Sequence, residues 1–80
     1  MPVPHYYFDI RDGQTLSVDE EGLTLANQRA AEIEAALSLA DTAKDLVPSA
    51  SSGSLAIEVR DDDGPIFRAA FLFGTARSNG

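Results

Sequence analysis

Polar and apolar residues alternate along the first part of the chain. From His5 to Arg11 one set of alternate positions is apolar and the other is mixed; the apolar set is Tyr6, Phe8 and Ile10, and the other is Tyr7, Asp9 and Arg11. A period of two residues predicts a half-buried strand. The alternation resumes from Thr15 to Val18 after Asp12-Gly13, a dipeptide suited to a turn with positive φ angles. The segment therefore predicts a β-hairpin.

A second pair of alternating segments lies near the C-terminus. Leu55 to Arg60 alternates, 61–65 is an acidic turn that ends in Gly-Pro, and Ile66 to Phe73 forms the partner segment. In this last segment Phe67, Ala69, Phe71 and Phe73 share one face. Its other face, with Ile66, Arg68, Ala70 and Leu72, is also largely apolar, so we expect both faces to be covered, one by a helix and the other by a partner subunit or by the chain's own ends.

Between the two pairs, Ala26 to Val47 is the only segment long and periodic enough for a substantial helix. Its apolar arc, centred on Ile33, predicts the face that lies on the core; the other members are Ala30, Ala36, Leu37, Ala40, Ala43 and Val47. Asn27 is the expected N-cap, with Thr24 as the alternative. Pro48 is expected to end the helix, and Ser49 to Ser54 to form a loop.

Two other groups of side chains lie outside this arc. Glu34, Ser38, Asp41 and Asp45 form an acidic stripe that we expect to face solvent. Leu39 and Leu46 either widen the contact with the core or mark a second contact surface.

Together these elements predict an α+β fold in the order ββαββ. We expect a four-stranded, mainly antiparallel sheet with one long helix packed on one face, in a single domain over residues 1–80. Residues 1–4 are an extended lead-in and 75–80 a flexible tail. Such a sheet leaves its other face bare, with Tyr7, Glu58, Ile66 and Leu72 expected on it. A mixture of aromatic, aliphatic and charged groups is typical of a dimer interface.

Composition and charge limit the classes of partner. The formal net charge is −7, and the six Lys and Arg residues are scattered, which argues against binding to nucleic acids or anionic membranes. The chain has no cysteine, no apolar run long enough to span a membrane and no signal-peptide pattern. We therefore expect a cytoplasmic protein.

No catalytic, cofactor-binding or metal-binding residue is predicted. His5 is the only histidine, so one chain cannot build a Ser-His-Asp triad or a histidine-rich metal site. Asp61 and Asp63 suggest a calcium loop, but in that register the first and twelfth ligand positions are Val59 and Ala70. The acidic segments 19–21 and 61–63 are interpreted as solvated turns.

The order of motifs resembles a family of small uncharacterised bacterial single-domain proteins, a domain of unknown function. The resemblance covers 4–73 and is carried by Tyr7-Phe8-Asp9-Ile10 with Asp12-Gly13, by the acidic turn before an Ala- and Glu-rich helix, and by 57–61 with Asp63-Gly64. It implies the fold and no activity. Ala26-Asn27 stands where the family commonly has Pro-Asp. A weaker likeness is to HicB-type antitoxins, which have a strand pair followed by an alanine-rich helix, although the DNA-binding segment of those proteins has no match here.

These observations predict a non-enzymatic protein-interaction or structural module that forms a homodimer. The interface is expected on the bare sheet face, on a sheet edge or on the helix flank with the two extra leucines; the candidate residues are Tyr7, Leu39, Leu46, Ile66 and Leu72. The alternative is an antitoxin-like regulator that binds a small basic protein through its acidic surface. A third hypothesis is a metal-dependent hydrolase that uses carboxylates of the two turns.

Overall fold

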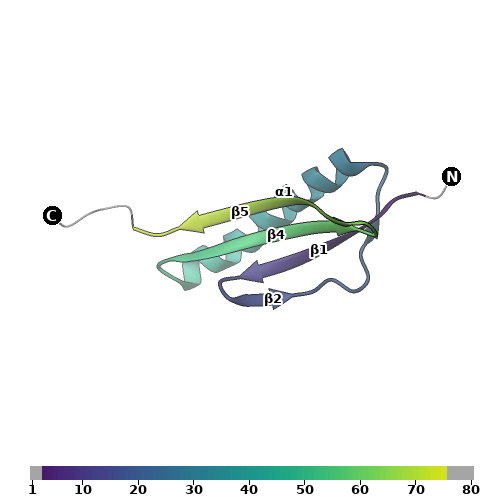
Figure 1. Cartoon of the computed structure of the whole chain (residues 1–80). Coiled ribbons are helices and arrows are strands. Elements are labelled where there is room, and N and C mark those ends of the chain that lie inside the picture. Colours follow the sequence, from purple (N-terminus) through teal and green to yellow (C-terminus); the bar gives the residue numbers. More distant parts are fainter. Residues whose placement is uncertain (1–2, 76–80) are drawn as a thin grey trace.

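A computed structural model describes residues 3–75 and has two layers, an antiparallel sheet and one helix behind it (Figure 1). The strands are β1 (His5–Asp12), β2 (Thr15–Ser17), β3 (Leu23–Thr24), β4 (Gly53–Asp61) and β5 (Gly64–Phe73). The α-helix, α1, is Gln28–Leu46, and a short 3₁₀ helix, η1 (Val47–Ser49), follows it directly. The α+β class and the antiparallel sheet predicted from the sequence are confirmed.

The sheet has five strands rather than the four predicted. Its order is β2-β1-β4-β5, and β3 pairs with the start of β1, beside the same edge as β2. The strand β3 is only two residues long, too short to produce an alternation in the sequence. Both predicted hairpins are present with two-residue loops, because Asp12 pairs with Thr15 and Asp61 with Gly64. Gly13 supplies the positive φ, 60°, that the first loop needs.

The strand periodicity correctly identifies the face of the sheet that meets the helix. Between β1 and β4, Phe8 pairs with Val59 and Ile10 with Ile57. On the other side of β4, Val59 pairs with Phe67 and Ile57 with Ala69 of β5. Ile57 and Val59 are the largest wholly buried side chains, and Tyr6 completes the strand side of the core.

The helix contacts this face with a different side from the one predicted. Ala31 and Ala35 are fully buried and Leu39 packs partly against them, whereas Ile33 and Leu37 are 48% and 63% exposed. The prediction that the arc centred on Ile33 lies on the core is therefore wrong at its centre, although Ala43, another member of the arc, is buried. The reason is steric, because the sheet already fills its inner face with aromatic and branched side chains. A helix can approach such a surface closely only if it presents small residues.

The ends of the helix agree with the sequence signals. Asn27 is the N-cap, and its side chain accepts a hydrogen bond of 2.9 Å from the backbone N–H of Ala30. Thr24, the alternative cap, lies instead in β3. The α-helix ends at Leu46, and Pro48 takes part in η1, where its fixed φ is tolerated. The predicted serine-rich loop is shorter than expected, because β4 already begins at Gly53.

Of the expected lead-in and tail, residues 1–2 and 76–80 lie outside the described part. Pro4 has no regular secondary structure, and its carbonyl accepts a hydrogen bond of 3.1 Å from the N–H of Leu25.

Candidate interaction surfaces

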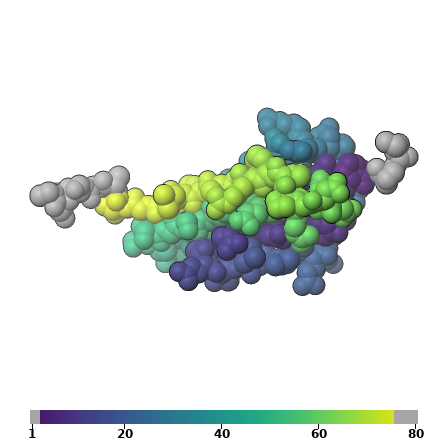
Figure 2. Space-filling model, in the orientation of Figure 1, coloured from purple at the N-terminus to yellow at the C-terminus, as the bar shows by residue number. Residues whose placement is uncertain are grey.

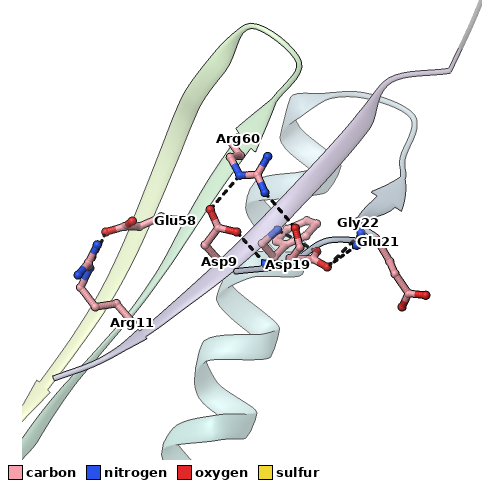
Figure 3. A network of polar contacts seen from close by, with 8 residues as sticks. Asp9, Arg11, Asp19, Glu21, Gly22, Glu58 and Arg60 are labelled. Atoms are coloured by element: carbon pink, nitrogen blue, oxygen red, sulfur yellow. Dashed lines mark hydrogen bonds and ion pairs between the residues drawn. The ribbon is translucent and has the colours of Figure 1, made fainter. Parts of the chain in front are cut away.

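The sheet face opposite the helix carries a polar network between β1, β4 and the loop after β2 (Figure 3). Asp9 is only 8% exposed, and both its oxygens are used: one accepts from Arg60 Nε and the other from the backbone N–H of Asp19, each at 2.9 Å. Arg60 also donates through Nη2 to the carbonyl of Asp19 at 2.9 Å. The bond to Asp9 raises the pKa of Arg60 above its ordinary value. The network ties the loop to the centre of the sheet.

Asp19 replaces a strand partner in the gap between β2 and β3. Its carboxylate accepts from the backbone N–H groups of Phe8, Glu21 and Gly22, at 3.1, 3.2 and 3.0 Å. Partial burial acts to raise the pKa of Asp19, but these three donors and the charge of Arg60 outweigh it, so the pKa lies below its ordinary value. The acidic turn is thus structural at Asp19, which the sequence analysis had interpreted as solvated.

A second row of charges crosses three strands of the same face. Arg11 of β1 and Arg68 of β5 both donate through Nε to Oε2 of Glu58 on β4, each at 3.3 Å. The bond from Arg11 lowers the pKa of Glu58, and the bond from Arg68 adds to this effect against the opposing effect of desolvation. We call these three residues the arginine row.

Figure 2 shows the uncovered face of the sheet from the front. Two hollows flank the arginine row on this face. The larger, of about 460 Å³, is lined by Asp9, Glu58, Val59, Arg60, Pro65, Ile66, Phe67 and Arg68. The smaller, of about 170 Å³, is lined by Arg11, Gly13, Ser54, Leu55, Ala56, Arg68, Ala70, Phe71 and Leu72. Arg68 lines both hollows.

A third hollow, of about 440 Å³, lies on the helix side of β5. It is lined almost entirely by apolar groups; its residues are Ala36, Leu39, Ala40, Ala43, Lys44, Val47, Ala69 and Phe71. β5 is an edge strand, with β4 on one side and no strand of the described residues on the other. The apolar arc predicted for the helix thus exists, but part of it extends past this edge. We call Ile33, Ala36, Ala40, Lys44 and Val47 the apolar flank.

The five predicted interface residues do not form one surface. Leu39 and Leu46 face the sheet: Leu39 packs against the core, and Leu46 lies near Gly53 of β4. Ile66, expected on the bare face, lines the larger hollow there and also packs partly against the core. It is the extra residue of a bulge, where Val59 pairs with Phe67 and Arg60 with Pro65.

Tyr7 and Leu72 lie on the uncovered face, as expected. Tyr7 is half-buried, with the Arg60 guanidinium carbon 4.4 Å from its ring centroid and the His5 ring at 4.9 Å. Leu72 is 83% exposed. The sequence analysis also placed Glu58 on this face, but it did not predict that Arg11, Arg60 and Arg68 meet the carboxylates there.

Residues 3–75 contain neither a metal-binding cluster nor a membrane-spanning helix. No three His, Asp or Glu side chains are grouped so that they could hold a metal ion. No helix in this range is long and apolar enough to cross a membrane.

Comparison with known families identifies the fold unit. The family model of DUF6894, a domain of unknown function, matches residues 5–72. The chain belongs to this family. The match begins at the first residue of β1 and ends one residue before the end of β5, so the DUF6894 unit comprises the whole sheet and the helix. No curated protein and no solved structure matches the chain significantly, so these comparisons lend no support to the likeness to HicB-type antitoxins.

Proposed function

We propose that this DUF6894 chain is a non-enzymatic protein-interaction module that works as a homodimer. The observation that carries the proposal is the position of the apolar flank beside the unpaired edge of β5. The edge has unpaired backbone N–H and C=O groups that a strand would satisfy. The apolar flank has side chains that a neighbouring helix would cover.

A second copy of the chain supplies both a strand for the edge of β5 and a helix for the apolar flank. If two β5 strands pair in antiparallel orientation about a two-fold axis, their helices lie on the same face of the extended sheet and side by side. A single extended peptide would satisfy the strand edge but would leave Ile33 uncovered. The fit of edge to edge and flank to flank therefore favours self-association over the capture of a peptide.

Charge supports the same arrangement. The apolar flank contains one charged residue, the cation Lys44, whose Nζ lies 4.0 Å from Oδ1 of Asp41. Each copy, with a net charge of −7, thus presents a cation rather than a carboxylate within the apolar flank.

The expected affinity is modest. Ile33 and Val47 are 48% and 43% exposed, so burying each contributes about 1 kcal/mol per side chain. Backbone pairing of the two edges contributes about 0.5–1.5 kcal/mol per hydrogen bond. Against the cost of association, these gains predict a dissociation constant on the order of micromolar.

The test is the molar mass of the full chain in solution over a dilution series from about 200 to about 1 μM, which brackets that constant. Two exposed alanines give matched variants, Ala40→Asp on the apolar flank and Ala70→Asp on the uncovered sheet face. We expect a dimer for the native chain and for Ala70→Asp, and a monomer for Ala40→Asp with unchanged circular dichroism. A native chain that is monomeric throughout, or a dimer broken only by Ala70→Asp, would refute this interface.

A second candidate function is a regulator that binds a small basic protein. The observation in its favour is the acidic side of α1, where Glu34 and Asp41 line a shallow hollow with Leu37 and Ser38. Such a partner would co-purify at low salt and dissociate at high salt, because exposed charge pairs are screened. Glu34→Lys should abolish this binding and leave self-association unchanged.

A further inference from the structure

The arginine row has an unusual balance of charge for a chain this acidic. Arg11 and Arg68 share a single carboxylate, and both bonds reach the same oxygen of Glu58. The row therefore carries one net positive charge on the sheet face that the helix leaves uncovered. Its arginine side chains are accessible, at 39% and 59% exposure.

Glu58 uses only one edge of each guanidinium. An arginine has five N–H donors in a planar fork, and here only Nε is engaged. Among residues 3–75, neither Arg11 nor Arg68 has another hydrogen bond, so the terminal pair of nitrogens on each remains available. That pair matches the two oxygens of a carboxylate or phosphate, in the bidentate geometry at which arginine is stronger than lysine.

The surroundings of the row indicate which oxyanion fits. The hollows of about 460 and 170 Å³ lie on either side, and Arg68 lines both. Their linings include Pro65 and Ile66 in one and Ala70 and Leu72 in the other. A ligand that fits this face needs an acidic group flanked by apolar side chains. The net charge of −7 opposes the approach of a polyanion such as a nucleic acid.

We propose that the arginine row is a docking site for a protein segment in which a carboxylate lies between apolar side chains. The carboxylate bridges Arg11 and Arg68 above Glu58, which makes the row electrically neutral. The flanking apolar side chains enter the two hollows. The site does not depend on the homodimer, because β5 contributes its unpaired backbone edge to that interface and side chains of its uncovered face, such as Arg68 and Leu72, to this one.

The experiment is calorimetric titration of the full chain with three probes. These are a capped Leu-Glu-Leu-Glu-Leu peptide, the same peptide with Gln in place of Glu, and inorganic phosphate. We expect the acidic peptide to bind and the Gln peptide to bind at least about tenfold more weakly, since charge-assisted bidentate bonds are lost. Phosphate should bind more weakly than the acidic peptide, because it has nothing to place in the hollows.

Variants locate the site. Arg68→Gln and Arg11→Gln should each weaken binding of the acidic peptide by about tenfold or more. The matched control is Arg29→Gln, which removes an arginine on α1 that is 78% exposed and paired with Glu32, and it should leave the affinity unchanged. The proposal is overturned if the acidic peptide fails to bind at millimolar concentration, if the Gln peptide binds equally well, if phosphate binds as tightly as the peptide, or if Arg29→Gln weakens binding as much as Arg68→Gln. Self-association of the native chain, measured separately, distinguishes failure of this site from failure of the dimer.

Discussion

The clearest test of the fold concerns Gly22, which lies where the acidic turn meets β1. Its φ is +70°, a backbone conformation that L side chains rarely adopt. A Cβ at this position would lie 2.6 Å from the backbone oxygen of Tyr6 and 2.6 Å from Nε2 of His5. The Gly22 N–H also donates to Asp19 at 3.0 Å. Gly22→Ala therefore perturbs the backbone angle, the contact with β1 and the anchoring of the turn together.

Gly13 offers a control in which only the first of these effects operates. Its φ is +60°, but a Cβ there would meet nothing within 4 Å. Placing alanine in a left-handed conformation costs about 1–2 kcal/mol, and this is the whole cost expected for Gly13→Ala. At Gly22 the backbone oxygen of Tyr6 cannot rotate away, so strain or a shift of β3 adds about 1–3 kcal/mol.

The measurement is thermal unfolding followed by circular dichroism, at one protein concentration for all variants because dimerisation would shift the midpoint. For a domain of this size each kcal/mol lowers Tm by about 4–8 °C. We expect Gly22→Ala to lower Tm clearly more than Gly13→Ala, by roughly 5 °C or more. Equal effects of the two substitutions would show that β3 does not hold the turn against β1, and would refute the argument.

Three further predictions follow from the polar network and the core. The pKa of Asp19 is lowered in the folded state. The ionised carboxylate therefore stabilises the fold above the unfolded pKa of about 3.9, and this stabilisation is lost as the pH falls through the folded pKa. Asp19→Asn should reduce the loss of stability on acidification, measured by urea unfolding between pH 6 and pH 2. Asp9→Ala leaves the part-buried N–H of Asp19 without its acceptor and should cost about 2 kcal/mol, measured by urea unfolding at pH 7. A loss below about 0.5 kcal/mol would contradict the network. Ala35→Leu should overpack the fully buried contact between helix and sheet and cost about 1–3 kcal/mol. Leu37→Ala should cost under about 1 kcal/mol in the same assay, because Leu37 is exposed. The reverse order would mean that the helix faces the sheet as the sequence analysis predicted.

The candidate surfaces were predictable only in part. Alternation placed Arg11, Glu58 and Arg68 on the faces of their strands away from the core, but it could not show that they lie in one row. That result requires the strand order β1-β4-β5, which places Glu58 between the two arginines. The sequence contains no local trace of the bonds from Asp19 to β1, because the partners are ten or more residues apart and the turn composition is that of a solvated loop.

The sequence by itself determined four of the five strands, the two tight turns and the ends of the helix. These features depend on short-range causes: the period of two in a half-buried strand, the freedom of glycine at positive φ, and the capping of free backbone groups by Asn27. Each can be identified within a few residues, so no knowledge of distant contacts is needed.

Tertiary structure decided which side of the helix faces the sheet. Apolar residues occupy more than half of the circumference of α1, so hydrophobicity alone does not select a side. The bulky inner face of the sheet selects the alanines, because Ala31 and Ala35 allow the helix to approach closely. Ile33 is left 48% exposed for the same reason. Periodicity measures how apolar a surface is, whereas the choice between two apolar surfaces depends on the shape of the surface that they meet.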